Sequence, residues 1–421
     1  MENTIQTWTE KLINKFGLED YEINPTISRE ISSIKTTVYT LNMEFFPNGT
    51  IAEEDSNPPG TILIEVNLTY GILTRFCVVM EEDLRKNPPL LPSSDWKTIT
   101  DWIEEHTTLK YKIDFLMLNE KKDESGTEYF FHSVLHERKV SPGGYIDIKV
   151  DKQGCIMNYS LYGFFHNLLP EITVEPATDQ LIQDIDKIKE KQVILFGIMK
   201  DKQIQLLYGV DEIFVDGEMV LDDEIILTWS EQDSILEVPL THGRIPDLWN
   251  AFYKSKLISE EEMKKNIPHP DSLVVTLEEQ SEFLQVIINY LREHRQAESG
   301  NWKVEQIERH NGLLEATVVP IRVLDRITDK MKFTYDVNEH IIVLVMDKRE
   351  LLELSGVMEL PVLDLDVKIS NEEAVKLLDK DIYFKPYYVY DEKRHSMKAK
   401  QMIDCHYFVD ALTGEIISEL Y

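Results

Sequence analysis

The pair His132 and His136, in the segment Phe-Phe-His-Ser-Val-Leu-His-Glu, is the strongest candidate for metal chemistry. Residues four apart share a face on a strand or a helix, so both imidazoles could approach one ion. A zinc site needs further ligands, and zinc hydrolases of the helical type carry His-Glu-x-x-His, which this segment lacks. The flanking aromatic residues favour a strand whose histidines line a sheet face, with a metal-assisted hydrolase as the alternative.

Nucleophilic and nucleotide chemistry have weaker support. The sequence holds no Gly-x-Ser-x-Gly elbow, no phosphate loop and no Gly-x-Gly-x-x-Gly segment. Cys405 alternates in a strand-like run beside His406, and adjacent strand residues point to opposite faces. We therefore expect no catalytic residues and no cofactor.

Carboxylates are abundant, and one stretch is dense in them. It comprises Asp211, Glu212, Asp216, Glu218, Asp222, Asp223 and Glu224. The stretch lacks the ligand spacing and central glycine of an EF-hand loop. We expect a solvated acidic surface rather than a calcium site.

Composition excludes several classes. The chain has 421 residues, 43% of them hydrophobic, so it can bury sizeable cores in about two or three domains. Lysine and arginine number 44 against 76 aspartate and glutamate, a formal net charge of −32. That balance disfavours nucleic acid and anionic lipid, which are bound through clustered basic residues. Three scattered cysteines (Cys77, Cys155, Cys405) are too few for a disulfide framework.

The beginning of the chain and its apolar runs bear on the compartment. The first residues form neither a basic nor an apolar region of a secretory signal. The apolar runs at 193–199 and 341–346 are far shorter than the roughly 20 residues that span a bilayer. The sequence predicts a cytoplasmic protein with no membrane partner.

Two segments far apart in the chain resemble each other. Phe214-Val215-Asp216 precedes Gly217-Glu218, and Phe408-Val409-Asp410 precedes Gly414-Glu415, 194 residues further on. Each is preceded by a strand-like run and an amphipathic segment, at 179–189 and 371–379. We therefore expect residues 178–221 to superpose on residues 370–421.

A looser similarity joins the N-terminal segment to the next one. Ile5-Gln6-Thr7-Trp8 is similar to Ile99-Thr100-Asp101-Trp102, and residues 61–66 are similar to residues 145–150. Trp8 and Trp102 fall on the apolar faces of their expected helices. Alternation in 62–68, 146–150 and 403–409 predicts antiparallel strands with one polar face.

Start and turn signals bound these elements. Ser259-x-x-Glu262, Thr276-x-x-Glu279 and Ser370-x-x-Glu373 are capping boxes that open helices. Turns that need a glycine at positive φ are expected at three places: Asp151 to Gly154, Asp216-Gly217 and Asp410 to Gly414.

The elements predict an α+β protein of about five repeated units, each with one helix packed on a small antiparallel sheet. The units begin near residues 3, 95, 178, 276 and 370. Proline-rich joints lie at 88–92 and 267–270. The predicted division is an N-terminal unit (1–92), a pair of units (93–221), a connector (222–272) and a second pair (273–421). Trp229 and Trp249 of the connector are candidate interface residues.

The C-terminal segment resembles a known family. Ser370-Asn371-Glu372-Glu373-Ala374, followed by strands that end Asp410-Ala411-Leu412-Thr413-Gly414-Glu415, is similar to the YcdB/YcdC-type repeat, a relative of PepSY domains. The similarity is good over 369–417, fair over 178–220 and only topological elsewhere. The resemblance implies a helix on an antiparallel sheet and a binding or inhibitory role, and it supplies no catalytic residues.

These observations together predict a non-enzymatic binding protein. It would recognise a basic protein or peptide through a sheet face, an exposed edge strand or the 222–272 connector. One alternative is a metal-assisted hydrolase using His132 and His136, and another is a stress-response or structural protein with no dedicated ligand.

Overall fold

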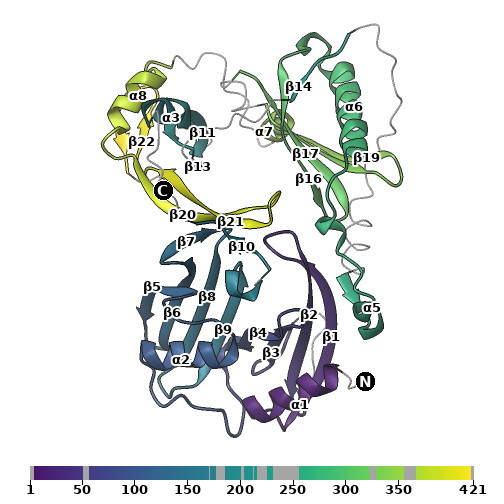
Figure 1. Ribbon diagram of the computed structural model, residues 1–421, viewed down its shortest axis with the longest axis vertical. Coiled ribbons are helices and arrows are strands. Elements are labelled where there is room, and N and C mark those ends of the chain that lie inside the picture. The colour runs from purple at the N-terminus through teal and green to yellow at the C-terminus, as the bar shows by residue number, and fades with distance from the viewer. Residues whose placement is uncertain are drawn as a thin grey trace. The chain divides into compact units, whose positions relative to one another are not determined.

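The computed structural model describes residues 4–50, 56–169, 171–176, 185–200, 203–211, 213–215, 225–230, 256–322, 329–354 and 367–418. It shows a mixed α+β protein that is mostly strands, with seven α-helices among these residues (Figure 1). Contacts divide the chain into two compact units. Unit 1 is 1–177, 253–272 and 387–399, and unit 2 is 178–252, 273–386 and 400–421. The expected connector is thus divided, because residues 257–258 pair with a strand of unit 1.

Unit 1 begins with two helices, each followed by strands. The first segment contains α1 (Thr4–Phe16), β1 (Tyr21–Ile31), β2 (Thr37–Pro47), β3 (Ile62–Asn67), β4 (Ile72–Val78) and η1 (Val79–Glu81). The second contains α2 (Trp96–His106), β5 (Phe115–Lys122), β6 (Gly126–Leu135), β7 (Arg138–Ser141), β8 (Gly144–Asp151), β9 (Ile156–Gly163), η2 (His166–Leu168) and β10 (Thr173–Val174). Later residues add β15 (Leu257–Ile258), α5 (Glu260–Lys264) and η3 (Pro270–Ser272).

The strands of unit 1 form one sheet. Its order is β15-β1-β2-β3-β4-β9-β8-β6, and β6 pairs on its other side with β5 and β7. All these pairings are antiparallel. The last strands of the two segments, β4 and β9, join them. One apolar core contains residues of α1, α2 and the sheet, so both helices cover the same face (Figure 1).

Two short parallel ladders depart from the purely antiparallel expectation. Residues 387–389 pair with β7, and residues 396–397 pair with β10. These residues belong to β20 (Tyr383–Asp391) and β21 (Ser396–Asp404). Residues 387–399, the end of β20 and the start of β21, belong to unit 1, whereas the rest of both strands belongs to unit 2. The parallel pairs therefore attach a hairpin to unit 1 and leave the antiparallel order of its main strands intact.

One part of unit 2 is a helix and a five-stranded antiparallel sheet. Its elements are β14 (Ile225–Leu227), α6 (Leu277–His294), η4 (Gln296–Glu298), β16 (Trp302–His310), β17 (Leu313–Pro320), β18 (Met331–Asp336), β19 (Ile341–Asp347) and α7 (Lys348–Leu354). The strands pair in the order β14-β16-β17-β18-β19. Phe283, Ile287 and Leu291 of α6, spaced about one turn apart, pack on this sheet.

The other part of unit 2, which we name the composite module, combines two distant segments: residues 185–215 on one side, and residues 367–386 and 400–418 on the other. The first supplies α3 (Ile185–Gln192), β11 (Val193–Lys200), β12 (Gln203–Val210) and β13 (Phe214–Val215). The second supplies α8 (Asn371–Leu378), β22 (Phe408–Asp410), β23 (Ile416–Ile417) and the parts of β20 and β21 at 383–386 and 400–404.

The two segments of the composite module exchange their short strands. β13 pairs with β21, so Phe214 lies opposite Met402. β22 pairs with β12, so Val409 lies opposite Tyr208. The two Phe-Val segments that resemble each other in sequence thus each complete the hairpin of the other half.

The helix starts expected from the sequence are confirmed. Ser259, Thr276 and Ser370 each cap a helix, and in each case the glutamate three residues later closes the capping box. Helices α1, α2, α6 and α8 begin within one residue of four of the five predicted unit starts, 3, 95, 276 and 370. The described part of α3 begins at Ile185, seven residues after the fifth predicted start at 178.

Candidate functional site

Unit 1 offers a sheet face that neither α1 nor α2 covers. Leu41 and Met43 of β2 and Ile64 and Val66 of β3 pack in the core with both helices. Successive strand residues point to opposite faces, so their neighbours, such as Glu65, lie on the other face. We call this surface the helix-free face.

A hollow of about 290 Å³ lies on the helix-free face. The β1–β2 turn, the facing ends of β3 and β4, and the chain that leaves β9 surround it. Its lining residues are Glu30, Ile31, Ser32, Ser33, Ile34, Val38, Thr40, Glu65, Asn67, Tyr70, Ile72, Thr74, Leu161, Tyr162, Gly163, Phe164, Phe165, Leu168 and Leu169. The volume lies just below the range for small-ligand sites, which is about 300–1,000 Å³.

The hollow combines buried apolar residues with a polar rim. Ile34, Ile72 and Phe164 are almost fully buried. The rim carries hydroxyl groups and two carboxylates, Glu30 and Glu65, whose side chains are 33% and 34% exposed. Among the described residues that line it, none is lysine, arginine or histidine. The hollow therefore has a negative rim above apolar walls.

Each rim carboxylate already meets one cationic group. Lys256 Nζ lies 2.9 Å from Glu30 Oε1, and Arg75 Nη1 lies 3.1 Å from Glu65 Oε1. Ser28 Oγ also donates to Glu30 Oε1 at 2.9 Å. Both ion pairs are substantially exposed, and such pairs contribute only about 0–1 kcal/mol.

Two tyrosines stand beside the hollow on the same sheet. Tyr162 lines it, and its ring stacks on that of Tyr145 with centroids 5.6 Å apart. The two are cross-strand partners on β9 and β8, and they are 52% and 42% exposed. Burial and the charge of Asp147 raise the pKa of Tyr162, so its hydroxyl stays protonated at neutral pH. The two stacked rings form a partly exposed aromatic surface at the edge of the hollow.

The structure separates the two candidate histidines. Phe131 packs in the helix-side core, so His132 lies on the helix-free face, opposite Tyr145. Burial and the charge of Lys139 lower the pKa of His132. β6 ends at Leu135, and His136 lies in the following turn at φ 48, with Nδ1 3.3 Å from the Tyr388 hydroxyl. The two histidines therefore do not share one continuous strand face.

The part of the chain that the structure describes does not bring together enough ligands for a metal site. No group of three or more histidine, cysteine, aspartate or glutamate side chains in that part could hold an ion. Within the expected acidic stretch only Asp211 is described, and burial raises its pKa.

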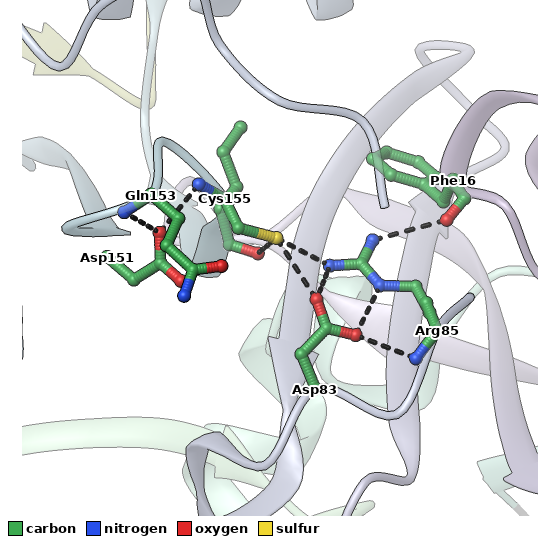
Figure 2. Close-up of polar contacts among 7 residues, drawn as sticks. Phe16, Asp83, Arg85, Asp151, Gln153 and Cys155 are labelled. Carbon is green, nitrogen blue, oxygen red and sulfur yellow. Dashed lines mark hydrogen bonds and ion pairs between the residues drawn. The ribbon is translucent and has the colours of Figure 1, made fainter. Parts of the chain in front are cut away.

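The three cysteines are unpaired, and Cys155 belongs to a buried polar cluster (Figure 2). Arg85 donates from Nε to Asp83 Oδ1 at 2.8 Å and from Nη2 to Asp83 Oδ2 at 2.7 Å. Arg85 also donates to the carbonyl of Phe16 at 3.2 Å and to Cys155 Sγ at 3.0 Å. Its side chain is 1% exposed. Asp151 accepts from the backbone N–H of Gln153 and of Cys155.

This cluster, the Arg85 cluster, is suited to structure rather than nucleophilic chemistry. Burial opposes ionisation of Asp83, but hydrogen bonds from Arg85 and Cys155 outweigh it and lower its pKa. Burial and the hydrogen bond to Asp83 raise the pKa of the Cys155 thiol to about 12, so the reactive thiolate is scarce at neutral pH. The cluster ties the end of α1 to the loop after β4 and to the start of β9, whose far end lines the hollow.

The structure describes two of the three turns in which a glycine at positive φ is expected. Gly154 and Gly414 adopt φ 90 and φ 76, and each follows an aspartate whose side chain accepts backbone N–H groups of the same turn. Asp216 and Gly217 lie outside the described residues.

The two candidate interface tryptophans also have different outcomes. Trp229 packs against the core of the five-stranded sheet, and its indole N–H donates to the Gln296 carbonyl at 3.2 Å. Trp229 is half-buried in this position, and its role as an interface residue stays a prediction. Trp249 lies outside the described residues.

Sequence reasoning did not single out the residues of the hollow. Alternation in 62–68 places Glu65 on a polar face, which is the usable signal. The hollow itself depends on the β1–β2 turn and the segment after β9, which are more than 120 residues apart in the chain and meet only in the fold.

No family model matches the chain, and no curated protein matches it. Among solved structures, it is similar to the Bacillus megaterium YpeB C-terminal domain over 50% of this chain and 86% of that one, at 14% identity and a TM-score of 0.27. A crystal structure of MucB matches over 49% of this chain and 75% of that one, at 6% identity and a TM-score of 0.09. At these values no function is transferred to this chain.

No helix among the described residues is long and apolar enough to cross a membrane.

Proposed function

We propose that this chain is a non-enzymatic binding protein that holds an extended peptide or protein segment against the helix-free face of unit 1. The observation that carries the proposal is the hollow, with its buried apolar walls, polar rim and adjacent exposed tyrosine pair. An apolar pocket ringed by a few polar groups is the usual form of a recognition site. Tyrosine adds contact area at low entropic cost.

The candidate reactive groups of unit 1 favour binding over catalysis. The Cys155 thiol is engaged and has a raised pKa, and His132 lies opposite a tyrosine rather than beside a nucleophile. The alternative of a metal-assisted hydrolase has no three-ligand group among the described residues to support it.

We further propose that the architecture consists of repeated helix-plus-strand units of the PepSY-like type. Three helices, α1, α2 and α6, each precede at least four antiparallel strands. The composite module supplies two shorter helix-plus-hairpin halves. The Ser-Asn-Glu-Glu-Ala segment at 370–374 opens α8, as the family resemblance implies.

The binding proposal is tested by filling the hollow. A random peptide library displayed on phage is selected against the purified full chain, and enriched peptides are titrated against two variants. Thr74→Trp places a large ring at the hollow, whereas Ser160→Trp places the same ring on the helix-free face outside it. We expect Thr74→Trp to reduce affinity at least tenfold and Ser160→Trp to leave it within twofold.

Both variants must first show wild-type thermal unfolding, because the comparison requires an intact fold. Equal loss in both variants would place the interface elsewhere on the face. Selection that yields no peptide, or peptides indifferent to Thr74→Trp, would overturn the proposal.

A further inference from the structure

We infer that the hollow recognises a lysine side chain of its peptide ligand, with the alkyl stem among the apolar walls and the ammonium at the glutamate rim. This inference rests on the binding function proposed above and specifies the chemistry of the ligand. The inference depends on the buried apolar side chains that form the walls of the hollow and on the more exposed glutamates at its rim.

The apolar walls fit the stem. Val38, Ile72 and Leu161 are each less than a tenth exposed and line the hollow. A lysine side chain buries its methylene groups against such a surface while its ammonium remains near water. The volume of about 290 Å³ accommodates one long side chain and not a folded partner.

The rim fits the ammonium. The two charged residues that line the hollow are both glutamates, and Ser32, Thr74 and Tyr162, which also line it, carry hydroxyl groups that can accept hydrogen bonds. A carboxylate or hydroxyl oxygen accepts hydrogen bonds from the three N–H groups of a lysine. The tyrosine ring also presents a face that attracts a cation.

An ammonium of this same chain shows that the rim accepts such a group. Lys256 Nζ lies 2.9 Å from Glu30 Oε1. This pair and the Glu65–Arg75 pair are exposed, so each carboxylate keeps acceptor sites for a further donor. The formal net charge of −32 for the whole chain adds a field that favours a basic ligand.

The test uses pentapeptides that differ at one side chain. The probes are acetyl-Ala-Ala-X-Ala-Ala-amide with X lysine or norleucine, together with the free diamine cadaverine. They are titrated against the full chain labelled at its isoleucine methyl groups. Ile31, Ile34 and Ile72 line the hollow and report occupancy directly.

We expect the lysine peptide to shift these three methyl signals and to bind about tenfold more tightly than the norleucine peptide, a difference of about 1.4 kcal/mol. The reason is that only the lysine ammonium can donate charge-assisted hydrogen bonds to the rim. Glu30→Gln and Glu65→Gln should each remove most of that ratio. The matched control is Glu44→Gln, because Glu44 lies on the same strand face but does not line the hollow.

The outcomes separate the two proposals. Equal affinity for lysine and norleucine overturns the lysine inference and leaves peptide binding intact. Cadaverine binding as tightly as the lysine peptide overturns a peptide as the source of the ammonium. If no probe shifts the three methyl signals, the lysine inference falls, and the phage selection with Thr74→Trp then decides the binding function independently.

Discussion

Unit 1 and the composite module both pack helices on antiparallel strands, but they take these strands from differently spaced parts of the chain. In unit 1, α1 and α2 are each followed directly by strands of the sheet that they cover. In the composite module, the short strands β13 and β22 each pair with the hairpin of the other segment, about 190 residues away. Local segments thus build the first, whereas the second forms only when two distant segments meet.

The polar contacts of unit 1 and of the composite module also differ. In unit 1 the Arg85 cluster fastens a loop, a helix end and a turn through one buried guanidinium. In the composite module, contacts of moderate strength bridge the two segments. Tyr208 donates to the Ile369 carbonyl at 2.9 Å, and Gln205 donates to Asp410 at 3.0 Å. We therefore expect large effects from one buried charge in unit 1 and distributed effects in the composite module.

The largest effect is expected from Arg85→Met. The substitution leaves Asp83 as an uncompensated, largely buried carboxylate, and breaking such a pair costs about 3–5 kcal/mol. Urea unfolding followed by tryptophan fluorescence measures the change. Arg75→Met removes an exposed pair and should cost less than about 1 kcal/mol. Equal losses in the two variants would show that the Arg85 cluster is not a buried anchor.

Leu206→Ala should show that the two segments of the composite module unfold together. Leu206 is fully buried on β12 in a core that also contains Leu378 of α8, and such truncation costs about 2–5 kcal/mol. Hydrogen exchange should rise in β12 and α8 alike. Leu412→Ala, at a 37% exposed position, is the control and should change stability by less than about 0.5 kcal/mol. Exchange that rises only in residues 185–215 would contradict a shared core.

The stability of unit 1 should depend on pH through His106. Burial, with a smaller contribution from Lys15, lowers the pKa of His106 to about 4. Its ring stacks on Trp102 at 3.9 Å, and its Nδ1 lies 2.7 Å from the Trp102 carbonyl. The unfolded chain binds this proton near pH 6.5 and the folded chain only near pH 4, so the contribution is complete above pH 6.5 and lost as pH falls to 4.

At 1.36 kcal/mol per pKa unit the full loss is about 3.4 kcal/mol, of which about 2.5 kcal/mol falls between pH 7.5 and 4.5. Unfolding free energies of the wild type and His106→Gln at pH 7.5 and 4.5 measure it. We expect the difference between the two pH values to shrink by that amount in the variant. An unaltered difference would mean that His106 is not held neutral by the fold.

The smallest effect is expected at the turn of the composite module. Gly414 has φ 76, and a Cβ there would lie 3.0 Å from Ile369 Cδ1. Gly414→Val should therefore cost about 1–3 kcal/mol, because a β-branched residue is strained at positive φ. Leu412→Val, in the same turn but without positive φ, is the control for thermal melts. A wild-type melting midpoint for Gly414→Val would show that the turn relaxes.

Signals within a few residues of one another are enough to predict the local elements of this chain. The capping boxes at Ser259, Thr276 and Ser370 determine helix starts because the capping hydrogen bonds are made within four residues. Alternation determined which strand residues face a core, and so placed Glu65 on a polar face. The similarity between the two Phe-Val segments predicts related structures, and each segment forms a short strand. The superposition of residues 178–221 on residues 370–421 stays a prediction.

Which of these elements pair with one another depends on contacts between segments far apart in the chain. Nothing in the local sequence indicates that β22 pairs with β12 rather than with the β20–β21 hairpin of its own segment. Either partner would match the alternation of β22 and would complete its backbone hydrogen bonds. The hollow likewise depends on the β1–β2 turn reaching the chain after β9. The burial that lowers the pKa of His106 and raises that of Cys155 also comes from packing between elements distant in sequence, because desolvation depends on what surrounds a group in space.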